Sequence, residues 1–159
     1  MANCLKGGGA TCIPVSFYCS NGGCGYNELQ KNHSDKIKFN KKYYSLRDNI
    51  LSKSNKGKHY INLYYGSSTH IIEALNAKII AKLIKAFPEI DKSVNRLLDK
   101  NYKGVIIESS LKSQLDELID LFYNNTSSQE FKKVLRQVKK DLNNFSNKNK
   151  EDFLKMLKA

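Results

Sequence analysis

The sequence lacks any long apolar run, because its longest stretches without charged residues lie near the N-terminus and are broken by glycines. A helix that spans a membrane needs about 20 predominantly apolar residues, so we exclude a transmembrane protein. The start of the chain, MANCLKGGG, also lacks a basic segment followed by an apolar one. We therefore expect either that the chain is not exported through such a signal or that a signal has already been removed.

Arginine is scarce, since only Arg47, Arg96 and Arg136 are arginines among 27 basic residues. The formal net charge of +12 invites a nucleic-acid partner, but recognition of base edges and bidentate binding of phosphate favour the guanidinium group. Residues 1–30 are neutral, so the whole excess lies in the rest of the chain. The charge is typical of a solvated, lysine-rich helical surface, and we keep nucleic-acid binding as the alternative.

Cysteine is absent after residue 24, and glycine is rare after residue 25. Cys4, Cys12, Cys19 and Cys24 share one glycine-rich segment with the spacing C-x7-C-x6-C-x4-C. An even number of clustered cysteines favours two disulfides, for which three pairings exist. Structural zinc sites pair cysteines two to four residues apart, so four zinc-bound thiolates are the weaker alternative, and free thiols are a further one.

The uneven placing of cysteine and glycine divides the chain in two. Residues 1–30 form a loop-like head that is too small to fold without staples, with a small hairpin as an option around the β-prone residues 12–19. Residues 40–159 form a lysine-rich helical body. We predict a mainly α protein, in which a bundle of six or seven helices follows the head.

The helical prediction for the body comes from apolar residues that recur every three or four positions. Three local signals refine it. Pro88 is expected to end one helix and to begin the next, Ser127 and Glu130 match a capping box, and Gly57 is expected to permit a left-handed connection. The expected apolar stripes span residues 43–51, 60–65, 71–87, 90–98, 111–122, 131–145 and 153–157.

Residues 43–72 carry a recognisable order of residues. An aromatic residue or leucine precedes Arg-Asp, a leucine follows three residues later, a glycine closes a polar break, and Tyr-Tyr and a serine precede the next helix. These positions are Leu46, Arg47, Asp48, Leu51, Gly57, Tyr64, Tyr65 and Ser68. The segment resembles the bacterial CFI-box-type C-terminal helical module of secreted or surface proteins. The resemblance implies a helical, exported or surface-associated module without assigned chemistry.

The motif also makes physical sense on its own. Arg47 and Asp48 can anchor a helix end to a neighbouring turn, while Tyr64 and Tyr65 can bury their rings and let their hydroxyls reach polar partners. We therefore expect a structural role for these residues.

No arrangement of residues in the sequence points to catalysis. Neither a nucleophile beside a base nor a phosphate-binding loop can be assigned, so we expect no enzyme, no catalytic residue, no cofactor and no metal. The first hypothesis is an extracellular, cell-surface or spore-surface structural module of a bacterium. It would bind proteins and form homo-oligomers or fibres through its cysteine-bearing head. The alternative is a lysine-rich helical nucleic-acid-binding protein with a zinc-binding cysteine head.

Overall fold

The structure is a computed structural model that describes residues 41–158. Within this range the chain is helical and contains no β-strand, which confirms the mainly α fold and the predicted number of helices. The predicted head of residues 1–30, with its four cysteines, lies outside the described residues. The seven α-helices and the short 3-10 helix η1 are α3 (Lys41–Asn49), η1 (Leu51–Lys53), α4 (Asn55–Gly66), α5 (Ser68–Ala74), α6 (Ala77–Leu98), α7 (Ser109–Asn125), α8 (Gln129–Phe145) and α9 (Lys150–Lys158).

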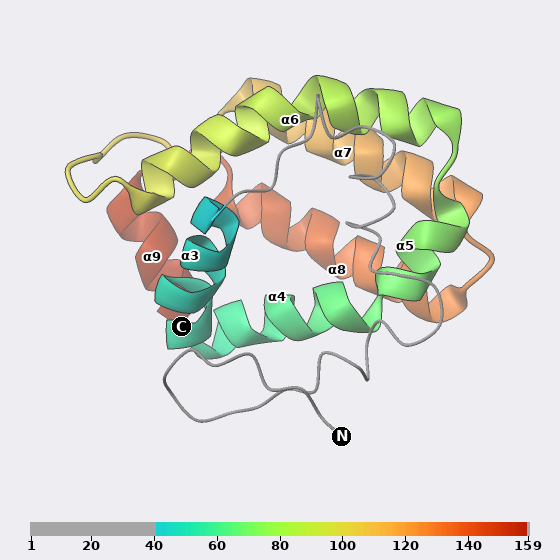
Figure 1. Cartoon of the computed structure of the whole chain (residues 1–159), viewed down its shortest axis with the longest axis horizontal. Coiled ribbons are helices and arrows are strands. Elements are labelled where there is room, and N and C mark those ends of the chain that lie inside the picture. The colour runs from blue at the N-terminus through green and yellow to red at the C-terminus, as the bar shows by residue number, and fades with distance from the viewer. Residues whose placement is uncertain (1–40, 159) are drawn as a thin grey trace.

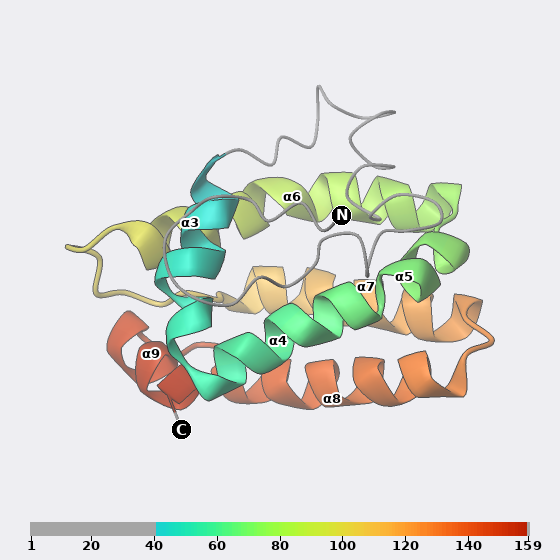
Figure 2. The same ribbon diagram turned by 60° about the horizontal axis from the view of Figure 1, so that its bottom comes forward.

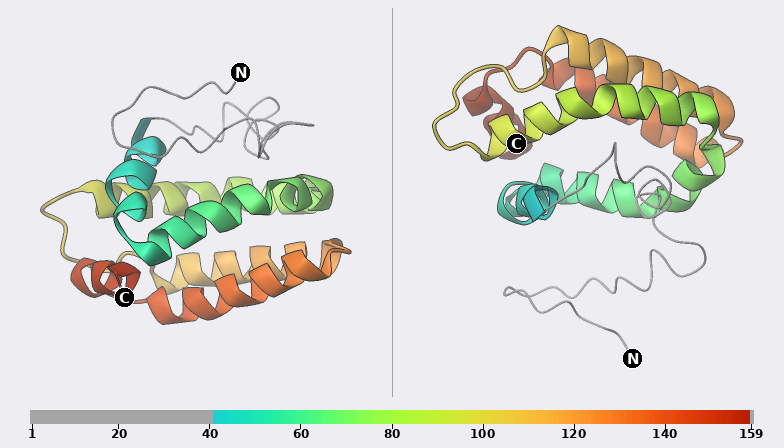
Figure 3. Two further views of the ribbon diagram at one scale, coloured as in Figure 1. Left: turned by 90° about the horizontal axis from the view of Figure 1, so that it is seen from below. Right: turned by 45° about the horizontal axis from the view of Figure 1, so that its top comes forward.

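Four helices run along the long dimension of the body, and three short ones close its ends. Helices α6, α7 and α8 follow one another up and down, and α4 lies beside them (Figure 1). Helix α3 stands steeply across the long helices at the end where α9 also lies (Figure 2). Helix α5 lies at the opposite end (Figure 3). Helix α6 packs against α7, and α7 packs against α8, so these three long helices form the frame.

Two hydrophobic clusters build the core. One fills the end of the body near α9, where Leu97, Ile106, Phe145, Phe153 and Leu157 come together. The other lies between α6 and α7 and contains Ile79, Ala86 and Leu118. Apart from Ile106, these side chains belong to the predicted apolar stripes, and their burial is the main favourable term in folding.

The loop between α6 and α7 is tied to the linker between α8 and α9. Ile106, which is only 1% exposed, donates its backbone N–H to the Lys148 carbonyl at 3.1 Å, and Ser93 Oγ donates to the Ile106 carbonyl at 2.8 Å. An antiparallel bridge joins Val105 to Asn149. These bonds satisfy backbone groups that burial of Ile106 would otherwise leave without a partner.

The prediction that Pro88 ends a helix is wrong, because α6 continues through it to Leu98. A proline inside a helix removes one backbone hydrogen bond and costs about 3 kcal/mol. Pro88 itself is exposed, and buried residues lie on both sides of it, with Ala86 before and Val94 after. Packing of both halves of α6 against the same body outweighs the local preference.

One predicted helix start is displaced by one residue, and one predicted helix is divided in two. Ser128 rather than Ser127 caps α8, since its side chain accepts from the Phe131 backbone N–H at 3.1 Å, and Glu130 therefore does not complete a capping box. The stripe expected over residues 71–87 is divided by a break at Leu75 and Asn76. The Asn76 side chain accepts from the Ile79 backbone N–H at 2.9 Å and so starts α6.

Gly57 lies in the first turn of α4, so the predicted left-handed connection is wrong. Its role is a close approach of two backbone segments. A Cβ at this position would lie 2.2 Å from the Leu51 carbonyl oxygen, and the Gly57 N–H donates to Ser54 Oγ at 3.0 Å. Only a residue without a side chain lets α4 start so near to η1.

Two tyrosine–carboxylate pairs fasten the N-terminal helices to the frame. Tyr60 on α4 donates to Asp141 on α8 at 2.8 Å, and Tyr43 on α3 donates to Asp91 on α6 at 2.9 Å. Asp141 is only 7% exposed, and Gln137 Nε2 also donates to it at 3.1 Å. Burial, followed by the bond to Asp141, raises the pKa of Tyr60, and burial, followed by the bond to Asp91, raises the pKa of Tyr43. Both hydroxyls therefore remain protonated donors across the physiological range.

We expect Gly57→Ala to lower the free energy of unfolding by about 3 kcal/mol, because the new methyl group meets backbone atoms that cannot move aside cheaply. Urea unfolding followed by circular dichroism measures this. Gly66→Ala is the matched control, since a Cβ there meets no atom of the described residues within 4 Å. Alanine should leave stability unchanged or raise it by up to about 1 kcal/mol. Equal stability of the two variants would contradict the close approach at Gly57.

Candidate functional site

Arg47 is the centre of the motif residues that the structure brings together. Its Nε and Nη2 donate to the two oxygens of Asp48 at 2.7 and 3.1 Å, and its Nη1 donates to the Tyr65 hydroxyl at 3.3 Å. The Asp48 hydrogen bond is the main cause that raises the pKa of Arg47, and the same bond lowers the pKa of Asp48. Arg47 thus links α3 to the helix α4, 18 residues further along the chain, rather than to a turn.

Tyrosine rings extend this link into a surface feature. The Arg47 guanidinium lies over the Tyr44 ring, 5.2 Å from its centroid, and the rings of Tyr64 and Tyr65 meet edge to face at 5.4 Å. We call Tyr44, Arg47, Tyr64 and Tyr65 the aromatic–arginine cluster.

The exposure of this cluster differs from the prediction, which places Tyr44 in an apolar stripe and buries the ring of Tyr64. Tyr44 is 51% exposed and Tyr64 44%. The prediction that the Tyr64 ring is buried is therefore wrong, because the ring contact with Tyr65 leaves much of it at the surface. Tyr44, which the motif does not include, is the most exposed of the large apolar or aromatic side chains described.

Ser68, the last residue of the motif, has a structural contact. It is buried, and its Oγ donates to the Tyr65 carbonyl at 2.9 Å. The N-cap of α5 is the neighbouring Ser67, whose side chain makes no capping bond. Ser68 therefore joins the end of α4 to the start of α5 and does not take part in the exposed cluster.

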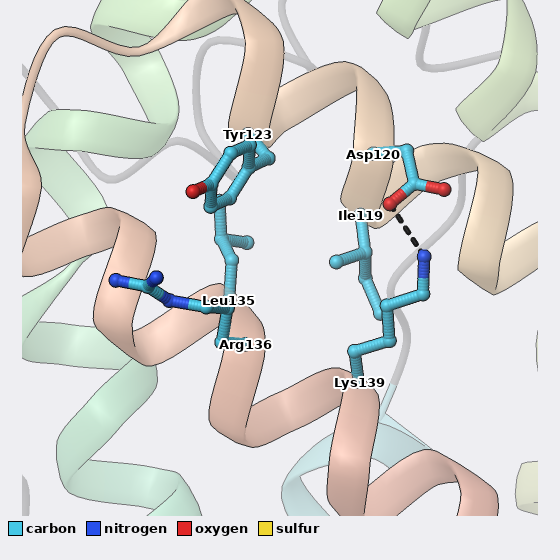
Figure 4. Close-up of a pocket in the computed structure, with 6 residues that line it drawn as sticks. All are labelled: Ile119, Asp120, Tyr123, Leu135, Arg136 and Lys139. Atoms are coloured by element: carbon cyan, nitrogen blue, oxygen red, sulfur yellow. Dashed lines mark hydrogen bonds and ion pairs between the residues drawn. The ribbon is translucent and has the colours of Figure 1, made fainter.

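A second feature lies between α7 and α8 and is shown in Figure 4. Ile119 and Leu135 face a cavity of about 240 Å³, with the Tyr123 ring and Arg136 on one side of it. On the other side Lys139 Nζ reaches Asp120 Oδ1 at 2.5 Å. The walls are thus mainly apolar, while charged groups stand at the edge.

The surface of α8 beside this cavity is strongly basic. Within the helix, Glu130 is the one exposed acid, because Asp141 is buried. Two cations cover Tyr123: Lys132 Nζ lies 5.2 Å and Arg136 Cζ 5.8 Å from its ring centroid. The basic face of α8 consists of Lys132, Lys133, Arg136, Lys139 and Lys140.

A wider cleft of about 800 Å³ lies where α3, the end of α6 and α9 meet. Ile50, Leu97, Leu98 and Leu154 supply its apolar lining. Its polar lining is Lys41, Lys42, Ser45, Asn49, Lys100 and Lys150. Two of these lysines already bind protein oxygens, since Lys42 pairs with Asp91 at 2.5 Å and Lys150 donates to the Asp99 carbonyl at 2.5 Å. The cleft is basic, but part of its charge holds the fold together.

Metal binding has no visible basis in the part of the chain that the structure describes. Histidine, aspartate and glutamate side chains of residues 41–158 do not gather in groups of three or more that could hold a metal ion. In the same range no helix is both long and apolar enough to cross a membrane. Cys4, Cys12, Cys19 and Cys24 lie outside the described residues, so the choice between disulfides, zinc and free thiols stays a prediction.

Comparison with known proteins gives no relative, since no protein-family model, curated protein or solved structure matches this chain. The resemblance of residues 43–72 to the CFI-box-type module therefore stays a prediction. What the structure contributes is the spatial relation between Arg47, Asp48 and Tyr65.

We expect Arg47→Ala to lower the melting temperature, because it removes the bonds to Asp48 and the bridge from α3 to Tyr65. Both partners are partly exposed, so the loss should be modest, about 1 kcal/mol. Differential scanning calorimetry measures the change. Lys58→Ala is the matched control, because this exposed cation lies on the neighbouring helix α4 and should tolerate removal. An unchanged melting temperature for Arg47→Ala would show that the bridge does not anchor α3.

Proposed function

We propose that the protein is a non-enzymatic structural module of a bacterial extracellular or cell-surface assembly, and that it binds a second copy of itself through the aromatic–arginine cluster. The observation that carries the proposal is an exposed aromatic surface around a preorganised arginine: Tyr44 lies under Arg47, and Tyr64 packs on Tyr65, the hydrogen-bond partner of Arg47. Tyrosine and arginine are enriched among the residues that dominate protein–protein binding energy. A cluster of this composition favours a protein partner.

Preorganisation supports a binding role for Arg47. Asp48 accepts hydrogen bonds from its guanidinium group, which also lies over the Tyr44 ring. A side chain whose geometry is already fixed loses less conformational entropy when a partner binds. The aromatic rings supply contact area at low entropic cost, because each tyrosine has only two side-chain torsions.

Self-complementarity favours a second copy as the partner. The cluster contains the cation Arg47 and aromatic rings, and the carboxylate of Asp48 adjoins it as the ion-pair partner of Arg47. In a twofold symmetric contact the same patch faces itself. Arg47 of one copy can then meet Asp48 of the other while the tyrosines pack between them.

Sedimentation equilibrium of the full-length protein over a wide concentration range tests this contact. We expect reversible association that Tyr44→Ala weakens about ten-fold, which corresponds to about 1.4 kcal/mol. Asn62→Ala, an exposed substitution on α4, is the matched control and should associate like the original protein. A protein that stays monomeric at every concentration, or an association that Tyr44→Ala leaves unchanged, would overturn the proposal.

The cysteine-bearing head is proposed to make such an assembly covalent, which is a separate claim. Intact mass of natively purified protein, with and without reductant, separates the two. Masses of cross-linked copies that vanish on reduction support links between chains. A monomer mass that rises by two hydrogens per bond on reduction indicates disulfides within one chain, and the non-covalent contact is then the whole of the assembly.

A further inference from the structure

We infer that the cavity between α7 and α8, together with the basic face of α8, forms a second binding site that accepts an acidic peptide segment of a partner protein. One apolar side chain of the segment enters the cavity, and its carboxylates meet the cations of α8. This site is independent of the aromatic–arginine cluster, which lies on α3 and α4.

The cavity has the size and lining for an apolar side chain. Its volume of about 240 Å³ exceeds the roughly 150 Å³ of an apolar cavity that holds benzene. Ile119, Leu135 and the ring of Tyr123 provide walls that favour a branched aliphatic or aromatic group over a polar one (Figure 4).

Charge complementarity identifies the flanking residues of the occupant. Of the five cations on the basic face of α8, Lys139 forms an ion pair with a carboxylate of the described residues, that of Asp120. Lys133, Arg136 and Lys140 are exposed. From Lys132 to Lys140 the face extends over eight steps of the helix, about 12 Å along the helix axis. A short acidic segment can therefore span it, and the concentrated positive charge steers such a segment toward the cavity.

The cations that cover the Tyr123 ring favour a peptide over single-stranded nucleic acid as the occupant. Proteins bind single strands by stacking bases on open aromatic faces beside a basic groove. Here Lys132 and Arg136 already lie over the Tyr123 ring. The two aliphatic walls of the cavity, Ile119 and Leu135, offer a base neither stacking nor a hydrogen bond.

Fluorescence anisotropy with defined probes tests the inference. The first probe is a fluorescein-labelled peptide of four glutamates, one leucine and four glutamates, and the second has alanine in place of leucine. A labelled oligo-dT of nine nucleotides is the third. We expect the full-length protein to bind the leucine peptide, and to bind the alanine peptide about ten-fold or more weakly, because three buried carbons are lost. Raising the salt concentration should weaken the binding of both peptides, because salt screens the attraction between opposite charges.

Substitutions separate the two halves of the site. Arg136→Glu should weaken the binding of the leucine peptide at least ten-fold. Lys103→Glu makes the same charge change in the loop before α7 and should have little effect on this affinity. Ile119→Phe fills the cavity and should abolish the preference for leucine over alanine while it retains the response to salt. Circular dichroism melting checks that each variant is folded.

Three outcomes would overturn the inference. Equal affinity for the leucine and alanine peptides would mean that the cavity takes no side chain. Tighter binding of oligo-dT with the same dependence on Arg136 would assign the face to nucleic acid. Absence of peptide binding at millimolar concentration would mean that the basic face is only a solvated surface. None of these outcomes bears on self-association through Tyr44, so the two proposals fail separately.

Discussion

The arrangement of the N-terminal helices depends on the buried carboxylate of Asp141. A charged group that is 7% exposed is costly unless hydrogen bonds satisfy it. Tyr60 and Gln137 donate to it, and Lys56 stands 4.0 Å away. Because Tyr60 and Lys56 belong to α4 and Asp141 to α8, satisfying the charge fixes α4 on the frame. Tyr60 also packs edge-on against Phe145, which belongs to the hydrophobic cluster near α9. The hydrogen bond and the hydrophobic packing of Tyr60 therefore both hold α4 against α8.

The placement of the aromatic–arginine cluster follows from this constraint. Helix α4 carries Tyr64 and Tyr65, and its start at Gly57 touches η1, which follows α3. Once α4 lies on α8, Arg47 can join Tyr65, and the aromatic–arginine cluster forms across two helices. The outer side of α8 carries its lysines and, together with α7, lines the cavity. One helix thus anchors α4 on its inner side and presents a charged surface on its outer side.

The sequence predicts the fold well and the surfaces only in part. Regular apolar spacing is a direct consequence of helix geometry, and for this reason α7, α8 and α9 lie where their stripes place them. The prediction that a helix ends at Pro88 is wrong because packing on both sides of the proline outweighs its local preference. Asp141 leaves a signal, since it stands three residues after Val138 and four before Phe145, on the apolar face. The partner of such a polar residue, and the exposure of Tyr64, depend on how distant helices pack, which spacing does not encode.

A double-mutant cycle on Tyr60 and Asp141 tests the central claim most directly. The free energy of unfolding in urea is measured for the original protein, Tyr60→Phe, Asp141→Asn and the double variant at pH 7. We predict a coupling energy of about 1–2 kcal/mol, because the bond joins a hydroxyl to a buried charge. The double variant should then lose less stability than the sum of the losses in the two single variants. Effects that add to within about 0.3 kcal/mol would show that the two residues act independently, and would contradict the account of how α4 is held.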